Sequence, residues 1–249
     1  MVIEKEEALK IAEEFTNEIW DIYPGKILAV YAIGSLGSDY YRPGQSDIDV
    51  AIITNFTRNE IGNVIKYIEQ VANEYVKRYQ IPKGFGSMTF AKEQLFAPYI
   101  AEEELVLEIL RVKMQSKLLR GSFDVNTIPS PSKQDIINDA RHFQEWCDED
   151  KRQNPDMGIN SSLMFVNSTL LALKRYLMIA HGIIVFNKFK IIGLYMENNP
   201  PIANTKIFSY IDDELKGKQQ DISKLELDKM VQWHDELYRT INNLTIYAK

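Results

Sequence analysis

Two short apolar runs joined by a polar loop constrain this chain more than any other feature of its sequence. Residues 27–33 and 48–53 are rich in β-branched and aromatic side chains, and a loop of Gly, Ser, Pro and Asp residues connects them. Runs of this length and composition, bounded by turn residues, are typical of buried β-strands. The sequence therefore predicts two neighbouring strands, with a Gly-Ser pair ending the first and an Asp-x-Asp pair opening the second.

The Asp-x-Asp pair, Asp47 and Asp49, has the spacing of a metal site. Side chains alternate between the faces of a strand, so both carboxylates are expected on the same side. Mg²⁺ prefers oxygen ligands and usually completes its shell with substrate phosphates. At the other strand end, Gly34 allows close approach of the backbone, and Ser35 can donate to a phosphate oxygen. Either pair alone also fits ordinary turn chemistry, but together they favour a metal-dependent phosphate site.

The pair Gly34-Ser35, followed by Ser46–Val50, resembles the signature of the DNA polymerase β-like nucleotidyltransferase superfamily. Within it, the arrangement of the chain is similar to that of aminoglycoside adenylyltransferases of the streptomycin and spectinomycin type. The resemblance implies nucleotidyl transfer, with AMP from ATP as the first expectation, and two Mg²⁺ ions held by Asp47 and Asp49. It also implies that Gly34, Ser35 and Ser46 contact the triphosphate.

One part of the superfamily pattern is missing. Members usually carry a third carboxylate on the next strand, where it binds metal or acts as a general base. Residues 84–90, which include the third apolar run at 85–90, contain no acidic residue. Glu93 follows the run, and further glutamates lie at positions 102, 103, 104 and 108. Either a carboxylate from elsewhere takes this role, or turnover is reduced or lost.

The remaining pattern predicts an α+β fold with two domains. Apolar residues at helical spacing mark residues 3–23, 58–79 and 101–120. Together with the three strands they make an N-terminal nucleotidyltransferase domain, residues 1–122, in which helices flank a small mixed sheet.

The rest of the chain, residues 123–249, is predicted to be an all-helical bundle. A segment rich in Pro and hydroxyl residues, 124–133, separates the two parts. Helical spacing and capping residues then predict helices at residues 133–150, 163–181, 188–198, 203–216 and 222–248.

Two lysines in the C-terminal part are further candidates for phosphate binding. Lys174 lies in the predicted helix 163–181, and Lys188 follows shortly after it. This stretch is similar to the C-terminal helical domain of the aminoglycoside adenylyltransferases, in which basic residues reach the triphosphate. The resemblance implies that role for Lys174 and Lys188; as an alternative, both are solvated surface lysines.

The composition of the chain limits the classes of partner that we expect. The 249-residue chain carries a formal net charge of -6, which argues against a nucleic-acid partner and suits a small hydroxylated, cationic acceptor. Its single cysteine, Cys147, excludes an internal disulfide and a Cys-rich metal site. Neither a signal-peptide pattern nor an apolar run of about 20 residues is present, so we expect a cytoplasmic protein without a membrane partner.

Three classes of function stay open at this stage. The first is an adenylyltransferase that modifies an aminoglycoside-like antibiotic and so confers resistance. The second is a nucleotidyltransferase with a protein or RNA acceptor, and the third is a nucleotide-binding module with reduced or lost catalysis. The sequence leaves the acceptor, the nucleotide base and the oligomeric state undecided.

Overall fold

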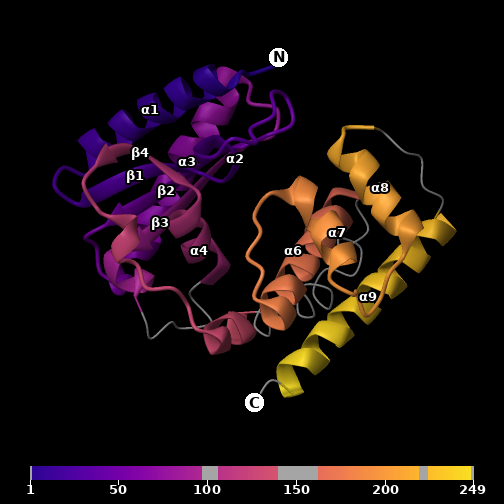
Figure 1. Ribbon diagram of the computed structural model, residues 1–249. Helices are drawn as coiled ribbons and strands as arrows, with labels where there is room; N and C mark the ends of the chain where they lie inside the picture. The colour runs from indigo at the N-terminus through magenta and orange to yellow at the C-terminus, as the bar shows by residue number, and fades with distance from the viewer. Residues whose placement is uncertain (1, 97–105, 140–161, 219–223, 248–249) are drawn as a thin grey trace. The chain divides into compact units, whose positions relative to one another are not determined.

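The computed structural model describes residues 2–96, 106–139, 162–218 and 224–247. The chain divides into two compact units, Met1–Pro131 and Ser132–Lys249 (Figure 1). The assignment of residues 1–122 and 123–249 to separate functional domains stays a prediction. Among the described helices, none combines the length and the apolar character needed to cross a bilayer.

A four-stranded mixed sheet with the strand order β3-β2-β1-β4 forms the centre of the first unit. β1 (Ile27–Ile33) pairs antiparallel with both β2 (Ile48–Thr54) and β4 (Ser116–Gly121), whereas β2 runs parallel to β3 (Phe85–Ala91). A parallel pair requires a crossover connection, which α3 (Arg58–Tyr79) supplies. The predicted α+β class, the first three strands and α3 are confirmed.

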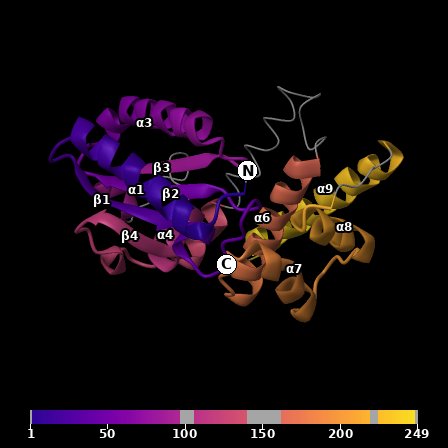
Figure 2. The same ribbon diagram turned by 90° about the horizontal axis from the view of Figure 1, so that it is seen from above.

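Helices cover both faces of this sheet. On one face, α1 (Lys5–Ile22) and α3 enclose a core in which Phe15 contacts the rings of Tyr75 and Phe85. α4 (Val106–Met114) packs on the other face, and Figure 2 shows α3 and α4 on opposite sides of the strands. Because β2 is covered on both faces, a charged side chain on it is costly unless it has a partner within the unit.

The prediction of a helix through residue 120 was wrong. α4 ends at Met114, and the chain turns at once into β4. β4 is an edge strand with half-exposed side chains, so it lacks the strict apolar alternation that marks a strand in the sequence. Its backbone hydrogen bonds to β1, a partner more than 80 residues earlier, decide its conformation instead.

Three short elements complete the first unit. The short elements are α2 (Gly34–Gly37), η1 (Lys92–Leu95) and η2 (Val125–Thr127).

Residues 133–139 are helical as expected. The predicted helical residues 101–105 and 140–150 lie outside the described part of the chain.

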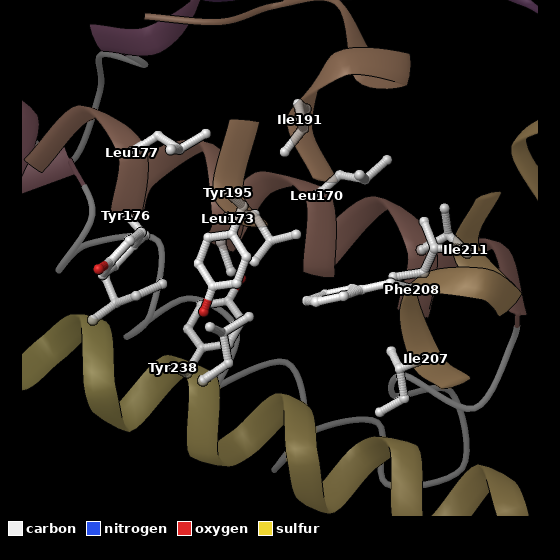
Figure 3. Close-up of a cluster of buried hydrophobic side chains, with 14 of the residues drawn as sticks. Leu170, Leu173, Tyr176, Leu177, Ile191, Tyr195, Ile207, Phe208, Ile211 and Tyr238 are labelled. Atoms are coloured by element: carbon white, nitrogen blue, oxygen red, sulfur yellow. The ribbon is translucent and has the colours of Figure 1, made fainter. Parts of the chain in front are cut away.

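The second unit is helical, as predicted. Besides the helical residues 133–139, its described part contains α6 (Ser162–His181), α7 (Lys188–Glu197), α8 (Thr205–Leu215) and α9 (Lys224–Tyr247). Figure 3 shows their shared core, in which Tyr195 contacts Tyr176 and Phe208 edge to face, with ring centroids 5.2 and 5.8 Å apart. The Tyr195 hydroxyl donates to the carbonyl of Ile202 at 2.8 Å, which satisfies the one polar atom of a fully buried ring.

Burial makes the stability of this unit sensitive to alkaline pH. Desolvation raises the pKa of Tyr195 to about 12 in the folded state, against about 10 in the unfolded chain. Between these values the unfolded state loses a proton that the folded state keeps, so stability falls as pH rises. We expect Tyr195 to lower the free energy of unfolding by about 1–3 kcal/mol between pH 10 and 12. Urea unfolding of wild type and Tyr195→Phe across this range measures it.

The control for that series is Tyr67→Phe, which removes an exposed phenol from the first unit. If the Tyr195→Phe variant shows the same loss between pH 10 and 12 as the wild type, the loss does not come from Tyr195.

Candidate active site

Asp47 and Asp49 lie at the start of the central strand. Asp47 directly precedes β2, and Asp49 is the second residue of the strand. Along β2, Ile48 and Val50 join the core beneath α1 and α3, whereas Ala51 and Ile53 face α4. The alternation therefore turns Asp49 toward α4, where it is buried, with 8% of its surface exposed.

Three strand ends meet at this edge of the sheet. β1 and β2 are antiparallel with Ala32 opposite Val50, so the end of β1 lies beside the start of β2. β2 and β3 are parallel with Asp49 opposite Gly86, which brings the start of β3 to the same edge. The Gly34-Ser35 turn, the two aspartates and the start of β3 therefore converge, as the predicted site requires.

Gly34 and Ser35 form the turn that follows β1. Gly34 has a φ of +61°, a conformation that favours glycine, and begins the short helix α2. The hydroxyl of Ser38 donates to the carbonyl of Gly34 at 2.7 Å and closes this turn. Ser35 Oγ is buried, and no hydrogen-bond partner for it lies among the described residues. A buried hydroxyl is rarely left unpaired, which is consistent with a ligand oxygen as its partner.

Arg111 on α4 reaches into this site and was not among the residues singled out in the sequence. Its Nη2 donates to Asp49 Oδ2, and its Nη1 donates to Glu108 Oε2 at 3.2 Å. The side chains of Arg111, Asp49 and Glu108 are 19%, 12% and 21% exposed, so the ion pairs are shielded from solvent. The buried acid on β2 thus has an internal cation as its partner.

Position 86 is where a third carboxylate would face the aspartates. A Cβ at Gly86 would collide with Asp49 Oδ1 and lie 3.5 Å from Asp49 Cγ. A carboxylate side chain at this position would therefore lie directly beside the carboxylate of Asp49. This chain has glycine there instead. The lack of an acid in this strand therefore falls at the position nearest to the aspartate pair.

The other acids considered for this role lie elsewhere. Glu93 follows the far end of β3, and its carboxylate accepts from the backbone N–H of Arg58 at 2.7 Å, at the start of α3. Glu108 is close to Asp49 but is paired with Arg111. Residues 102–104 lie outside the described part of the chain. Of the described candidates, only Glu108 is linked to Asp49, because both carboxylates pair with the guanidinium of Arg111.

Comparison with known proteins agrees with this geometry. A family model described as a nucleotidyltransferase domain matches residues 9–112, which include the Gly34-Ser35 turn, both aspartates, β3 and Arg111. Residues 9–112 form a nucleotidyltransferase domain. The resemblance drawn from the two-strand motif is therefore confirmed. A search of curated proteins gave no significant match.

The nucleotidyltransferase domain and the helices after it together share a fold with a solved enzyme. A crystal structure of spectinomycin adenyltransferase AAD(9) from Enterococcus faecialis with ATP and spectinomycin matches with a TM-score of 0.59 and 15% identity. The match covers 93% of this chain and 98% of the other. A toxin-antitoxin structure with AMP-PNP matches over 57% of this chain and 92% of the other, at 13% identity and with a TM-score of 0.31.

Electrostatics in the nucleotidyltransferase domain favour an ion pair at neutral pH. Desolvation raises the pKa of Asp49 to about 6, Arg111 opposes that rise, and the neighbouring charge of Asp47 adds to it. Burial alone would lower the pKa of Arg111, but Asp49 and Glu108 outweigh it and raise that pKa above its usual value. Arg111 is thus the counter-ion that favours the charged form of Asp49.

The remaining predicted residues lie in different surroundings. Ser46 is buried and its Oγ accepts from the backbone N–H of Arg42 at 3.0 Å, which closes the loop before Asp47. Lys174 and Lys188 belong to the second unit, where their ammonium groups lie 5.0 and 5.6 Å from the ring centroids of Phe186 and Phe189. The contacts of Ser46, Lys174 and Lys188 with a triphosphate stay predictions.

Sequence reasoning also missed Tyr40. Its hydroxyl donates to Gln115 Oε1 at 2.6 Å, and burial raises its pKa while the nearby charge of Arg111 lowers it. Its position in the loop between the two strands was the available signal. The location of Arg111 carried no such signal, because only the packing of α4 on the sheet brings residue 111 next to residue 49.

Within the described part of the chain, the donor set fits one divalent cation better than two. Among the residues that the structure describes, no group of three or more His, Cys, Asp or Glu side chains could hold a metal. Mg²⁺ is nevertheless commonly bound by one or two carboxylates together with substrate phosphates, which Asp47 and Asp49 can provide. The second ion implied by the resemblance would lack a carboxylate at position 86, and Arg111 already engages Asp49.

Proposed function

We propose that this protein is an adenylyltransferase that transfers AMP from ATP to a hydroxyl group of a small cationic acceptor of the aminoglycoside type. The observation that carries the proposal is the convergence of Asp47, Asp49 and the Gly34-Ser35 turn at one sheet edge within a nucleotidyltransferase domain. The shared fold with spectinomycin adenyltransferase over most of both chains supports the acceptor class.

Each residue of the site has a task in this reaction. Gly34 and Ser35 hold oxygens of the triphosphate, through backbone N–H groups and the buried hydroxyl. Asp47 and Asp49 would hold Mg²⁺, which when bound neutralises charge on the phosphates and the leaving group. Lys174 and Lys188 are proposed as further phosphate contacts.

The reaction itself is an in-line displacement. The acceptor oxygen forms a bond to the α-phosphorus, and the bond from that phosphorus to the oxygen bridging the α- and β-phosphates breaks. Pyrophosphate leaves with the bonding electron pair. The hydroxyl proton passes to water or to a carboxylate from outside β3. We also propose a cytoplasmic location and, for an antibiotic acceptor, a resistance phenotype.

Incubation with candidate acceptors tests this proposal. Purified protein is mixed with ATP, Mg²⁺ and either spectinomycin or streptomycin, and the antibiotic is analysed by mass spectrometry. We expect an adenylylated antibiotic and an equal amount of pyrophosphate, with neither formed when the acceptor is omitted. Parallel reactions with GTP, CTP and UTP identify the base. Unmodified antibiotics in every reaction would contradict the proposed acceptor class.

The glycine at position 86 favours a second candidate, a nucleotide-binding module with reduced or lost turnover. In that case ATP binds, as measured by calorimetry, but no acceptor becomes modified. A protein or RNA acceptor is the further alternative, and it predicts transfer only when a cellular partner is added to the reaction.

A further inference from the structure

Each partner of the Asp49–Arg111 ion pair lies against a glycine at the candidate active site. On one side is Gly34, where a Cβ would lie 2.9 Å from Arg111 Cζ. At the Asp49 end of the ion pair is Gly86, where a Cβ would collide with Asp49 Oδ1. Side chains at either position would force the pair to move, so both glycines permit the same Asp49–Arg111 contact.

The position of α4 directs Arg111 toward Asp49 and Gly34. The helix packs on the sheet face toward which Asp49 points, and Glu108, one turn before Arg111, holds the second guanidinium nitrogen at 3.2 Å. With two carboxylates bound and most of its surface covered, the guanidinium is fixed in place. It is a permanent positive charge next to one of the two acids that would hold the metal.

This charge competes with a second divalent cation. A second ion sharing Asp49 would lie within a few ångströms of the guanidinium, where two like charges repel strongly in a buried site. It would also need a further carboxylate, and Gly86 offers none. Arg111 therefore occupies the place beside Asp49 that a second cation would take, and it supplies the positive charge of that cation.

We propose that this domain binds its nucleoside triphosphate with a single divalent cation, and that Arg111 supplies beside Asp49 the positive charge of a second one. The inference rests on the proposed function, because it assumes that a nucleoside triphosphate binds at Asp47 and Asp49. In this arrangement Arg111 neutralises the buried carboxylate and faces the phosphates next to the Gly34-Ser35 turn.

Counting bound Mn²⁺ tests the proposal without relying on activity. Electron paramagnetic resonance reports free Mn²⁺ during titration of the protein saturated with a non-hydrolysable ATP analogue. For the wild type we expect one Mn²⁺ in each protein–nucleotide complex. In Arg111→Gln we expect affinity for the analogue to fall about tenfold to a hundredfold, because a charge-assisted contact is lost. Arg111→Lys should recover part of that loss.

A double variant reverses the arrangement. Gly86→Glu with Arg111→Gln adds the missing carboxylate and removes the guanidinium, and we expect it to bind two Mn²⁺ in the complex. Arg120→Gln is the matched control: Arg120 lies on β4, its Nη1 donates to Asn17 Oδ1 at 2.8 Å, and it is outside the site. This control should bind the analogue and one Mn²⁺ as the wild type does.

The outcomes separate the two proposals. Two Mn²⁺ in the wild-type complex, or an Arg111→Gln variant that binds the analogue with unchanged affinity, would overturn the inference and leave the proposed function standing. A wild type that binds no nucleotide at millimolar concentration would overturn the proposed function, and the inference with it. Thermal unfolding of each variant verifies that it is folded before the titration.

Discussion

Replacement of both Asp47 and Asp49 by asparagine is expected to lower nucleotidyl transfer by at least about a thousandfold. Asparagine keeps the size of each side chain but removes the negative charge that would hold Mg²⁺ against the phosphates, and electrostatic stabilisation of this kind is worth several kcal/mol in the transition state. Steady-state kinetics with ATP and a modified acceptor measure the loss. Calorimetry with ATP and Mg²⁺ reports the same effect on nucleotide binding.

Two single variants make this experiment specific. Asp47→Asn leaves the Asp49–Arg111 ion pair intact, so its loss of activity cannot be assigned to a broken pair. Asp39→Asn removes an exposed acid from the same loop and should keep wild-type activity. An Asp47→Asn enzyme with wild-type turnover would refute the assignment of this residue, and an inactive Asp39→Asn enzyme would show that the loop tolerates no change.

The substitution Gly121→Ala is expected to destabilise the first unit by about 2–5 kcal/mol. Gly121 ends β4 with a φ of +99°, which costs about 1–2 kcal/mol for a residue with a side chain. A Cβ there would also collide with the carbonyl oxygen of Leu28 and lie 2.6 Å from Ala29 Cα. Backbone atoms of β1 cannot move aside cheaply, so overpacking adds about 1–3 kcal/mol. Urea unfolding gives the free-energy difference.

Gly25→Ala separates these two contributions. Gly25 also has a positive φ, +72°, but no atom lies within 4 Å of a Cβ built on it. Its substitution should therefore cost only the backbone contribution of about 1–2 kcal/mol. If both variants lose the same stability, close packing of β4 on β1 is not the reason why residue 121 must be glycine.

Strong local patterns account for the part of the fold that was predicted. Apolar runs of strand length mark β1, β2 and β3, and helical spacing marks α1 and α3, because each of these elements buries a face with a regular period. β4 escaped prediction because it is a half-exposed edge strand, whose conformation depends on hydrogen bonds to β1 rather than on its own pattern.

The sequence by itself determined the motif, the strand pair that carries it and the helical second half of this protein. The spacing of Gly34-Ser35 and of Asp47 and Asp49 can be recognised locally, since it depends only on a turn and on a period of two residues. Tertiary structure alone decided what surrounds Asp49. Parallel pairing of β2 with β3 places Gly86 opposite it, and the packing of α4 brings Arg111 to its carboxylate. Contacts between residues 49, 86 and 111 arise from strand register and helix docking, which no local period encodes.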